Sequence, residues 1–188
     1  YHDLAQEIET ALGLPPLVAL ILTTRHITST IQANDYLDCR LENLHPPDNI
    51  PDLDKAVSRI VRALEQREQI AVYGDYDVDG VTATAVLYEF LKAAGANVCC
   101  YIPHRIKEGY SLQAEHITAH AVPQNIDLII TADCGSASHA AIDVARQAAI
   151  DVIVTDHHEM PDPLPQALAI INPKRPDCPS GMGSLAGV

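Results

Sequence analysis

The chain has 188 residues, 47% apolar and 20% charged, which suits one sizeable globular domain with or without a helical extension. Its formal net charge of −13 argues, taken alone, against a nucleic-acid-binding protein, which is usually basic. The apolar run near the N-terminus is far too short to span a membrane, and no signal peptide is recognisable. Five cysteines without a CxxC pair argue against a disulfide framework and a structural zinc site, and predict free thiols in a reducing cytoplasm: Cys39, Cys99, Cys100, Cys134 and Cys178.

Residues 1–68 are predicted to form a helical extension. Apolar residues recur at helical spacing before Gly13, and a second apolar helix is expected from Pro16 to about Thr24. The polar, proline-containing stretch 26–51 indicates a loop with a short helix. Asp52 is then expected to cap a helix with one apolar face, formed by Leu53, Ala56, Val57, Ile60 and Leu64.

From residue 69 onward, short apolar strands alternate with helices. This pattern predicts an α/β domain over 69–188, with a parallel β-sheet covered by helices on both faces. The expected strands are 70–73, 98–102, 126–131, 150–155 and 167–171. The expected helices are 81–94, 113–120 and 136–148.

Acidic and imidazole side chains follow three of these strands, in YGDYDVDG (73–80), TADCGS (131–136) and TDHH (155–158). Ligands bind at the carboxyl ends of parallel strands, so these groups are expected at one edge of the sheet. Carboxylates grouped with histidine suit manganese, magnesium or zinc. Bound cations would also reverse the negative charge locally.

The spacing of Asp75, Asp77 and Asp79 also opens an EF-hand loop. That loop needs a glutamate at its twelfth position, which Val86 occupies here, and a strand rather than a helix precedes the run. Helix capping explains one such aspartate, but three within five residues repel one another unless cations neutralise them. The run therefore favours a metal site.

Asp133 by itself is as well explained by helix capping as by metal binding, and its position at a strand end favours metal. Ser136 is the more natural cap of the following helix. The sharpest signal is Asp156-His157-His158, because two adjacent histidines at the end of an apolar strand are seldom accidental. One neutral imidazole can ligate a metal, and its neighbour can contact a phosphoryl oxygen.

Together, the three motifs in this order resemble those of the DHH phosphoesterase superfamily, and within it the RecJ family of exonucleases. The resemblance continues through CYIPHRIKEGYSL (100–112) and AIINPKRPDCPS (169–180), and spans nearly the whole chain. It implies a two-metal phosphodiesterase that uses Mn²⁺ or Mg²⁺ to degrade single-stranded DNA from 5′ to 3′ in DNA repair and recombination. It also implies that the chain is a fragment, weakly active alone, without a fourth motif and a C-terminal DHHA1 domain.

The resemblance also implies roles for individual residues. Metal ligands would be Asp77, Asp79 and His157, with Asp133 bridging both ions at the catalytic centre. Asp75 and Asp156 would orient the ligands, His158 would contact the scissile phosphate as the second catalytic residue, and Arg105 would contact a DNA phosphate or remain a solvated loop charge. Tyr73 departs from the pattern, because some members have a metal-binding histidine there.

Two alternatives remain open from the sequence. Another DHH phosphoesterase would act on oligoribonucleotides, cyclic dinucleotides or pyrophosphate. A non-catalytic relative would keep the fold as a protein-binding scaffold, and would have no need to retain the metal ligands.

Overall fold

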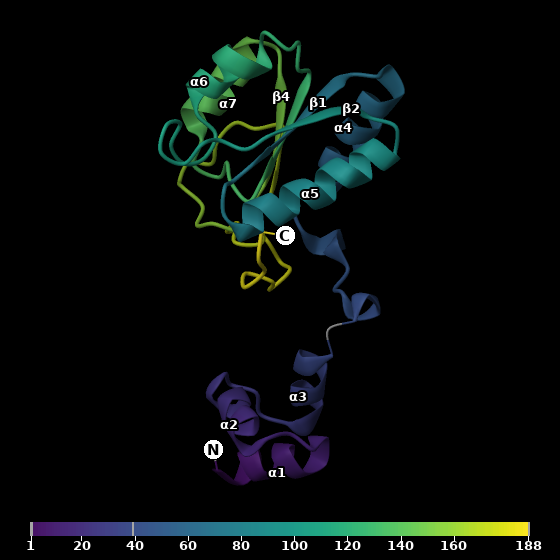
Figure 1. Ribbon diagram of the computed structural model, residues 1–188, viewed down its shortest axis with the longest axis vertical. Helices are drawn as coiled ribbons and strands as arrows, with labels where there is room; N and C mark the ends of the chain where they lie inside the picture. Colours follow the sequence, from purple (N-terminus) through teal and green to yellow (C-terminus); the bar gives the residue numbers. More distant parts are fainter. Residues whose placement is uncertain (1, 39, 188) are drawn as a thin grey trace. The chain divides into compact units, whose positions relative to one another are not determined.

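The computed structural model describes residues 2–38 and 40–187 and divides into two compact units, Tyr1–Pro46 and Pro47–Val188 (Figure 1). The second unit begins well before residue 69, where the sequence analysis sets the start of the α/β domain. The difference arises because helix α4 (Leu53–Gln66) packs with the sheet. None of the helices in the described ranges is long and apolar enough to cross a membrane.

The first unit contains three short helices, α1 (His2–Leu12), α2 (Pro16–Thr24) and α3 (Thr30–Leu37), followed by the 3-10 turn η1 (Leu41–Asn43). This confirms the two predicted helices and the short helix within 26–51. The hydroxyl of Ser29 begins α3 by accepting a hydrogen bond from the N–H of Gln32 at 3.2 Å. A small apolar core joins the helices, formed by Ala5, Ile8, Ala19, Leu22, Ile27 and Ala33.

The second unit contains a five-stranded parallel sheet, which confirms the predicted α/β fold. The strands lie in the order β2-β1-β3-β4-β5. In β1, for example, Val72 pairs with Cys100 of β2 on one side and with Ile130 of β3 on the other. The strand bounds are β1 (Gln69–Gly74), β2 (Asn97–Tyr101), β3 (Leu128–Ala132), β4 (Asp151–Thr155) and β5 (Ala169–Ile171).

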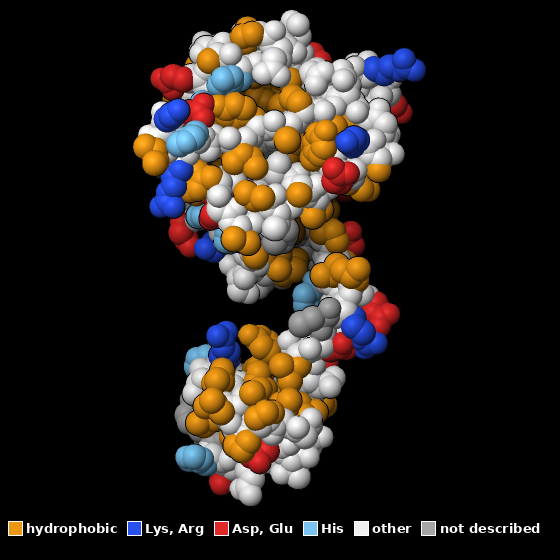
Figure 2. All heavy atoms as spheres, in the orientation of Figure 1, with side chains coloured by type: hydrophobic (Ala, Val, Ile, Leu, Met, Phe, Trp, Pro, Cys, Tyr) orange, Lys and Arg blue, Asp and Glu red, His pale blue; other side chains and the backbone are white. Residues whose placement is uncertain are grey.

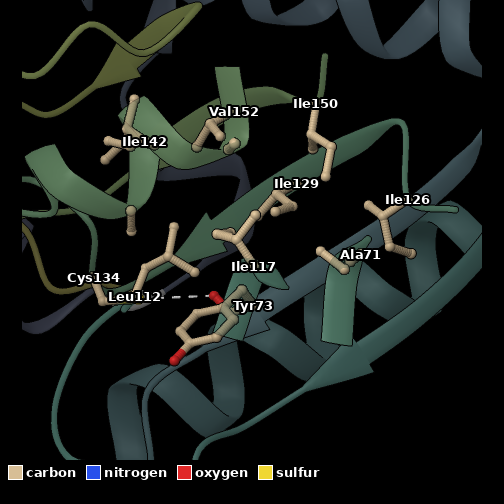
Figure 3. Packing of buried hydrophobic residues seen from close by; sticks show 14 of the residues in the cluster. Ala71, Tyr73, Leu112, Ile117, Ile126, Ile129, Cys134, Ile142, Ile150 and Val152 are labelled. Atoms are coloured by element: carbon tan, nitrogen blue, oxygen red, sulfur yellow. Dashed lines mark hydrogen bonds between the residues drawn. The ribbon is translucent and has the colours of Figure 1, made fainter. Parts of the chain in front are cut away.

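Helices cover both faces of this sheet because successive strand side chains point to opposite sides. Ile70 and Val72 pack in the cluster with α4 and α5 (Val78–Ala93), whereas Ala71 and Tyr73 pack in the opposite cluster (Figures 1 and 3). That opposite face carries α6 (Ala114–His116), the π-helical turn η3 (Ile117–Ala121) and α7 (His139–Gln147). Burial of each large aliphatic side chain contributes about 1.5–3 kcal/mol.

Helix α5 begins three residues before the predicted start at Val81, because Asp77 caps it. Its inner face packs Ala83 and Leu91 on the sheet. Its outer face leaves apolar side chains exposed: Val78, Val81, Val86 and Phe90. Figure 2 shows apolar side chains scattered over this face of the second unit.

Asp52 is the N-cap residue of α4, as predicted, but its side chain does not cap the helix, and the predicted cap Ser136 is wrong. In each case a tertiary contact takes the capping side chain. Asp52 has a left-handed backbone, with φ 62°, and its carboxylate instead accepts hydrogen bonds from the Ile170 N–H at 3.1 Å and the Arg175 guanidinium at 2.6 Å. Ser136 lies before α7, whose N-cap is Ser138, and its hydroxyl accepts a hydrogen bond from the Asn172 amide at 3.0 Å. Val57, expected on the apolar face of α4, is 51% exposed.

The described cysteines agree with the expectation of free thiols. Cys99, Cys100, Cys134 and Cys178 are unpaired, and Cys134 is buried beneath the carboxyl edge of the sheet. Cys39 lies outside the described residues.

Candidate metal centre

The carboxyl edge of the sheet gathers buried polar side chains, one directly after each of four strands. Asp75 follows β1, Asp133 follows β3, Asp156 follows β4 and Asn172 follows β5. All four are at most 7% exposed. Buried carboxylates are costly unless they are hydrogen-bonded or neutralised, so the partners of each group reveal what the edge is built to hold.

Asp75 lacks such partners. Both of its carboxylate oxygens are buried, and neither accepts a hydrogen bond from the described residues. Burial raises the pKa of Asp75 above its usual value. The Tyr76 N–H approaches without hydrogen-bond geometry and acts the other way, and the neighbouring Asp77 raises the pKa further. Gly80 packs against it so closely that a Cβ there would lie 2.6 Å from the Asp75 backbone. An orphaned carboxylate in a fitted pocket is what a bound cation would satisfy.

Asp77 and Asp79 flank the start of α5. Asp77 is the N-cap, and its Oδ1 accepts the N–H of Gly80 at 3.0 Å. Asp79 lies in the first turn, and its Oδ2 accepts the N–H of Gly187 at 3.1 Å. Figure 1 shows the C-terminal segment beside the start of α5, in agreement with this bond.

Asp133 and His157 make the most informative contact of the edge. Nδ1 of His157 lies 2.9 Å from the carbonyl oxygen of Leu185, which can only accept, so Nδ1 carries a proton. Nε2 then faces Oδ1 of Asp133 at 3.1 Å and Oδ2 of Asp79 at 3.9 Å. In neutral histidine this nitrogen bears a lone pair, and a lone pair facing two carboxylates requires a proton or a metal ion between them.

The surroundings of Asp133 reinforce this conclusion. Its backbone is left-handed, with φ 62°, a conformation that costs a non-glycine residue about 1–3 kcal/mol and is concentrated at functional sites. Burial raises the pKa of Asp133 to about 6, and Asp77 contributes in the same direction. A Cβ at Gly187 would lie closer to the Asp133 carboxylate than any contact allows.

Asp156 differs, because both of its carboxylate oxygens are satisfied. Oδ2 accepts the N–H of Ser136, and Oδ1 accepts bonds from the N–H of His157 at 2.8 Å, the N–H of His158 at 3.1 Å and Nδ1 of His158 at 2.7 Å. Burial alone would raise the pKa of Asp156, but the bonds from Ser136 and His158 hold it below its usual value. Asp156 thus holds the backbone after β4 and the ring of His158 in place.

His158 is held from both ring nitrogens. Nδ1 contacts Asp156, and Nε2 lies 3.3 Å from the hydroxyl of Tyr110. Burial alone would lower the pKa of His158, yet the contact with Asp156 gives it a pKa above its usual value. A histidine in this state donates a proton or stabilises negative charge.

The donor atoms form two groups that fit divalent cations. Ligand atoms of Asp75, Asp77 and Asp133 lie within 4.8 Å of one another, as do those of Asp133, His157 and His158. Asp133 belongs to both groups. Asp75 joins one of them, although the sequence analysis gives it only an orienting role, and Asp79 reaches the second through its 3.9 Å approach to His157.

Arg105 lies apart from this cluster in the exposed loop between β2 and α6. Its guanidinium carbon lies 5.2 Å above the ring of Tyr76, whose edge meets Tyr110 at 6.2 Å between centroids. The arginine is exposed and makes no ion pair with the described residues. It can therefore meet an anion arriving at the site.

Four groups of the site escaped the sequence analysis. Asn172 is fully buried and donates to the Ser136 hydroxyl at 3.0 Å and the His158 carbonyl at 2.9 Å. The sequence feature that could have identified Asn172 is its position directly after a predicted strand, like the three aspartates. The Tyr110 hydroxyl, the Leu185 carbonyl and Gly187 reach the site from loops, whose course no sequence pattern gives.

Known proteins are similar to this chain over nearly its whole length. The model of the DHH family, N-terminal domain, matches residues 69–188. The single-stranded-DNA-specific exonuclease RecJ of Bacillus subtilis is 38% identical over 187 residues, and that of Escherichia coli is 38% identical over 177. These alignments cover 100% and 93% of this chain but only 24% and 30% of those relatives, so the chain spans less than a third of their length.

Two solved structures are similar over most of the chain. A crystal structure of exonuclease RecJ bound to manganese gives a TM-score of 0.67 at 37% identity, covering 73% of this chain and 34% of that one. RecJ from Thermus thermophilus in complex with Mn²⁺ gives 0.68 at 32% identity, covering 94% and 24%. With its motifs, its parallel sheet and a family match over 69–188, the chain belongs to the DHH family.

Proposed function

We propose that this chain carries the metal-dependent hydrolytic centre of a single-stranded-DNA exonuclease that removes nucleotides from 5′ to 3′. The names and bound manganese of the similar RecJ proteins support the substrate and the cofactor. A DNA substrate and the free thiols are consistent with the reducing cytoplasm.

The observation that carries this proposal is the 3.1 Å approach of His157 Nε2 to Asp133 Oδ1, with Nδ1 already committed to a carbonyl. A simple ion pair between His157 and Asp133 would explain this contact, but it would leave the nearby buried carboxylate of Asp75 without a partner. Two cations explain both features, because Asp133 is common to both groups of donors.

The ligands follow from these groups. Asp75 and Asp77 would hold one Mn²⁺ or Mg²⁺ with Asp133, and Asp79 and His157 would hold the second with the same residue. Bound divalent cations supply an acidified water molecule and neutralise charge on a phosphate. Asp156 and Asn172 orient His157 and His158 from behind.

His158 and Arg105 are the groups proposed to meet the substrate. His158 keeps both nitrogens engaged, so its Nε2 proton would be shared between Tyr110 and a non-bridging phosphate oxygen. Arg105 would contact a neighbouring phosphate of the strand. The net charge of −13 leaves few other cations for a polyanion, which is why further domains like those of the longer relatives are proposed partners in binding DNA.

The test is nucleotide release by the full-length protein with Mn²⁺ from single-stranded DNA labelled at the 5′ or the 3′ end. The wild type is compared with Asp133→Asn, and with Asp143→Asn on the outer part of α7 as a matched control. We expect 5′-first release by the wild type and the control, and loss of release in Asp133→Asn.

Dinucleotides and pyrophosphate are assayed in parallel. Preferred hydrolysis of either one would contradict the exonuclease in favour of another DHH activity. Mn²⁺ binding without hydrolysis of any substrate would favour a scaffold.

A further inference from the structure

Tyr73 lies on β1 two residues before Asp75, and its side chain packs in the apolar cluster on the α7 side of the sheet (Figure 3). It is 4% exposed. Its ring stacks on those of Tyr101 and His116, each at 5.6 Å between centroids. The thiol of Cys134 also reaches its carbonyl oxygen, at 3.8 Å (Figure 3). Tyr73 is therefore a rigid part of the scaffold beneath the site.

The hydroxyl of Tyr73 reaches the loop that connects β2 to α6. Nδ1 of His116 lies 2.7 Å away and already accepts the Gln113 N–H at 3.2 Å, so it must accept from Tyr73 as well. The single hydroxyl proton is shared between this nitrogen and the carbonyl oxygen of Ser111 at 3.1 Å. Because a buried hydroxyl needs a hydrogen-bond partner, the Tyr73 hydroxyl holds this loop against the end of β1.

Ser111 is held in a conformation that it would not adopt freely. Its φ is 64°, in the left-handed region that serine disfavours. Its carbonyl oxygen contacts the Tyr73 hydroxyl, and its own hydroxyl lies 3.0 Å from the hydroxyl of Ser138, the residue before α7. Strain of this kind persists only where the surroundings impose it, and the described surroundings impose it through these two contacts.

The left-handed turn at Ser111 determines where Tyr110 points. The Tyr110 hydroxyl lies 3.3 Å from Nε2 of His158, and the two rings meet edge to face at 6.1 Å. Gln113 further fixes the Tyr110 carbonyl by donating its amide at 2.6 Å. If Ser111 relaxed to a right-handed or extended conformation, Tyr110 would leave His158.

A separate anchor holds the other end of the same loop. The carboxylate of Glu108 accepts the N–H of His104 at 2.7 Å and the hydroxyl of Tyr101. The loop would therefore stay attached if the Tyr73 contact were lost. Removing the Tyr73 hydroxyl should release the Ser111 end alone.

We propose that Tyr73 is a positioning residue, whose hydroxyl holds Ser111 in its left-handed turn and so presents Tyr110 to His158. The inference rests on the proposed phosphodiester hydrolysis, in which His158 meets the phosphate. The contacts run from the scaffold to Tyr110 by two routes, through the Ser111 carbonyl and through His116 and Gln113.

The kinetic test uses the full-length protein with Tyr73→Phe, Tyr110→Phe, the double variant, and Tyr88→Phe on α5 as a control with the same chemical change. We expect kcat on single-stranded DNA to fall on the order of tenfold to a hundredfold in each single variant, as for misplacement of one catalytic group. KM and Mn²⁺ affinity should stay close to wild type. The double variant should match the lower single variant, because both changes break one chain.

Multiplying effects in the double variant, or reduced Mn²⁺ affinity in Tyr73→Phe, would overturn the proposal in favour of a merely structural role. Tyr110 is 45% exposed, so its variant tests the last contact even if Tyr73→Phe folds poorly. A wild-type kcat in Tyr110→Phe would also overturn the proposal.

A second measurement is independent of activity. Chymotrypsin cleavage after Tyr110, followed by mass spectrometry, reports how firmly the Ser111 end of the loop is held. Cleavage there should be severalfold faster in Tyr73→Phe than in wild type and Tyr88→Phe. Unchanged cleavage in Tyr73→Phe would overturn the positioning role of Tyr73. A wild type without nuclease activity would contradict the proposed function, and the cleavage rates alone would then test the positioning role.

Discussion

At the residue scale, the site is defined by which carboxylates lack a partner. Asp156 has bonds to both oxygens and a lowered pKa, whereas Asp75 has none and Asp133 has a pKa raised to about 6. All three directly follow strands in the sequence, so sequence position alone does not distinguish a ligand from an orienting residue. The distinction comes from loops that deliver or withhold N–H donors.

The raised pKa of Asp133 predicts how pH affects stability in the presence of EDTA. A carboxyl with a folded pKa of about 6 and an unfolded pKa near 3.8 is neutral in both states at low pH, and its burial lowers the unfolding free energy as pH rises through that window. Asp133→Asn removes the charge. We expect wild type and variant to unfold at similar urea concentrations near pH 4, and the variant to be more stable above pH 6.

With Mn²⁺ at pH 7 the order should reverse, because the wild type gains binding free energy that the variant lacks. Urea denaturation with and without Mn²⁺ measures both effects. A variant no more stable than wild type in EDTA at pH 7 would show that the Asp133 carboxylate has a partner other than a cation.

The two histidines should separate binding from turnover. His157 faces Asp133 and Asp79, whereas His158 is held by Asp156 and Tyr110. His157→Ala is expected to weaken Mn²⁺ binding in calorimetry. His158→Ala should bind Mn²⁺ normally and lose on the order of 10²–10³ in kcat, as when one charge-stabilising donor is removed. His45→Ala, in the first unit, is the control, and the reverse pattern would exchange the two roles.

At the scale of elements, the strands were predictable and the helix ends were not. Continuous apolar runs such as Leu128–Ala132 are typical of a buried strand, and their alternation with helices along the chain gives a parallel sheet. Helix boundaries depend on which group takes the capping side chain. Asp52 and Ser136 carry suitable side chains for a cap, but each is bound to a segment distant in sequence, which local patterns do not reveal.

The contact of Asp52 predicts a stability effect at the start of α4. Its carboxylate joins the Ile170 N–H and the Arg175 guanidinium, linking α4 to β5 and the loop that follows. Asp52→Asn keeps the shape and the left-handed preference but loses the charge. We expect a loss of about 1–3 kcal/mol in urea denaturation, typical of a charged hydrogen bond. Asp54→Asn, exposed on the same helix, should change stability little; equal effects would mean that the contact is not formed in solution.

At the scale of the whole molecule, every group of the site comes from the second unit. The strands, the carboxylates, both histidines and the loop residue Tyr110 all lie within Pro47–Val188. The helices α1 to α3 have their own apolar core. The chain is thus organised as an α/β unit that holds the candidate metal centre and a separate helical unit.

The two candidate domain boundaries, after residue 46 and after residue 68, predict different behaviour on truncation. A chain of residues 47–188 keeps α4, including Arg59, whose side chain is 5% exposed and lies 2.6 Å from Asp151 at the start of β4. It should therefore unfold at the same urea concentration as the whole chain and bind Mn²⁺ with the same affinity.

A chain of residues 69–188 lacks α4 and uncovers part of the sheet, since Ala56 and Ala63 are buried against it. It also removes Arg59 and Arg62, the two cations that pair with Asp151, although Asp151 is 36% exposed and stays in contact with water. We expect this shorter chain to unfold at a much lower urea concentration or to aggregate, and to bind Mn²⁺ weakly. Equal stability of the two truncated chains would assign α4 to the helical extension, and place the start of the α/β domain at residue 69.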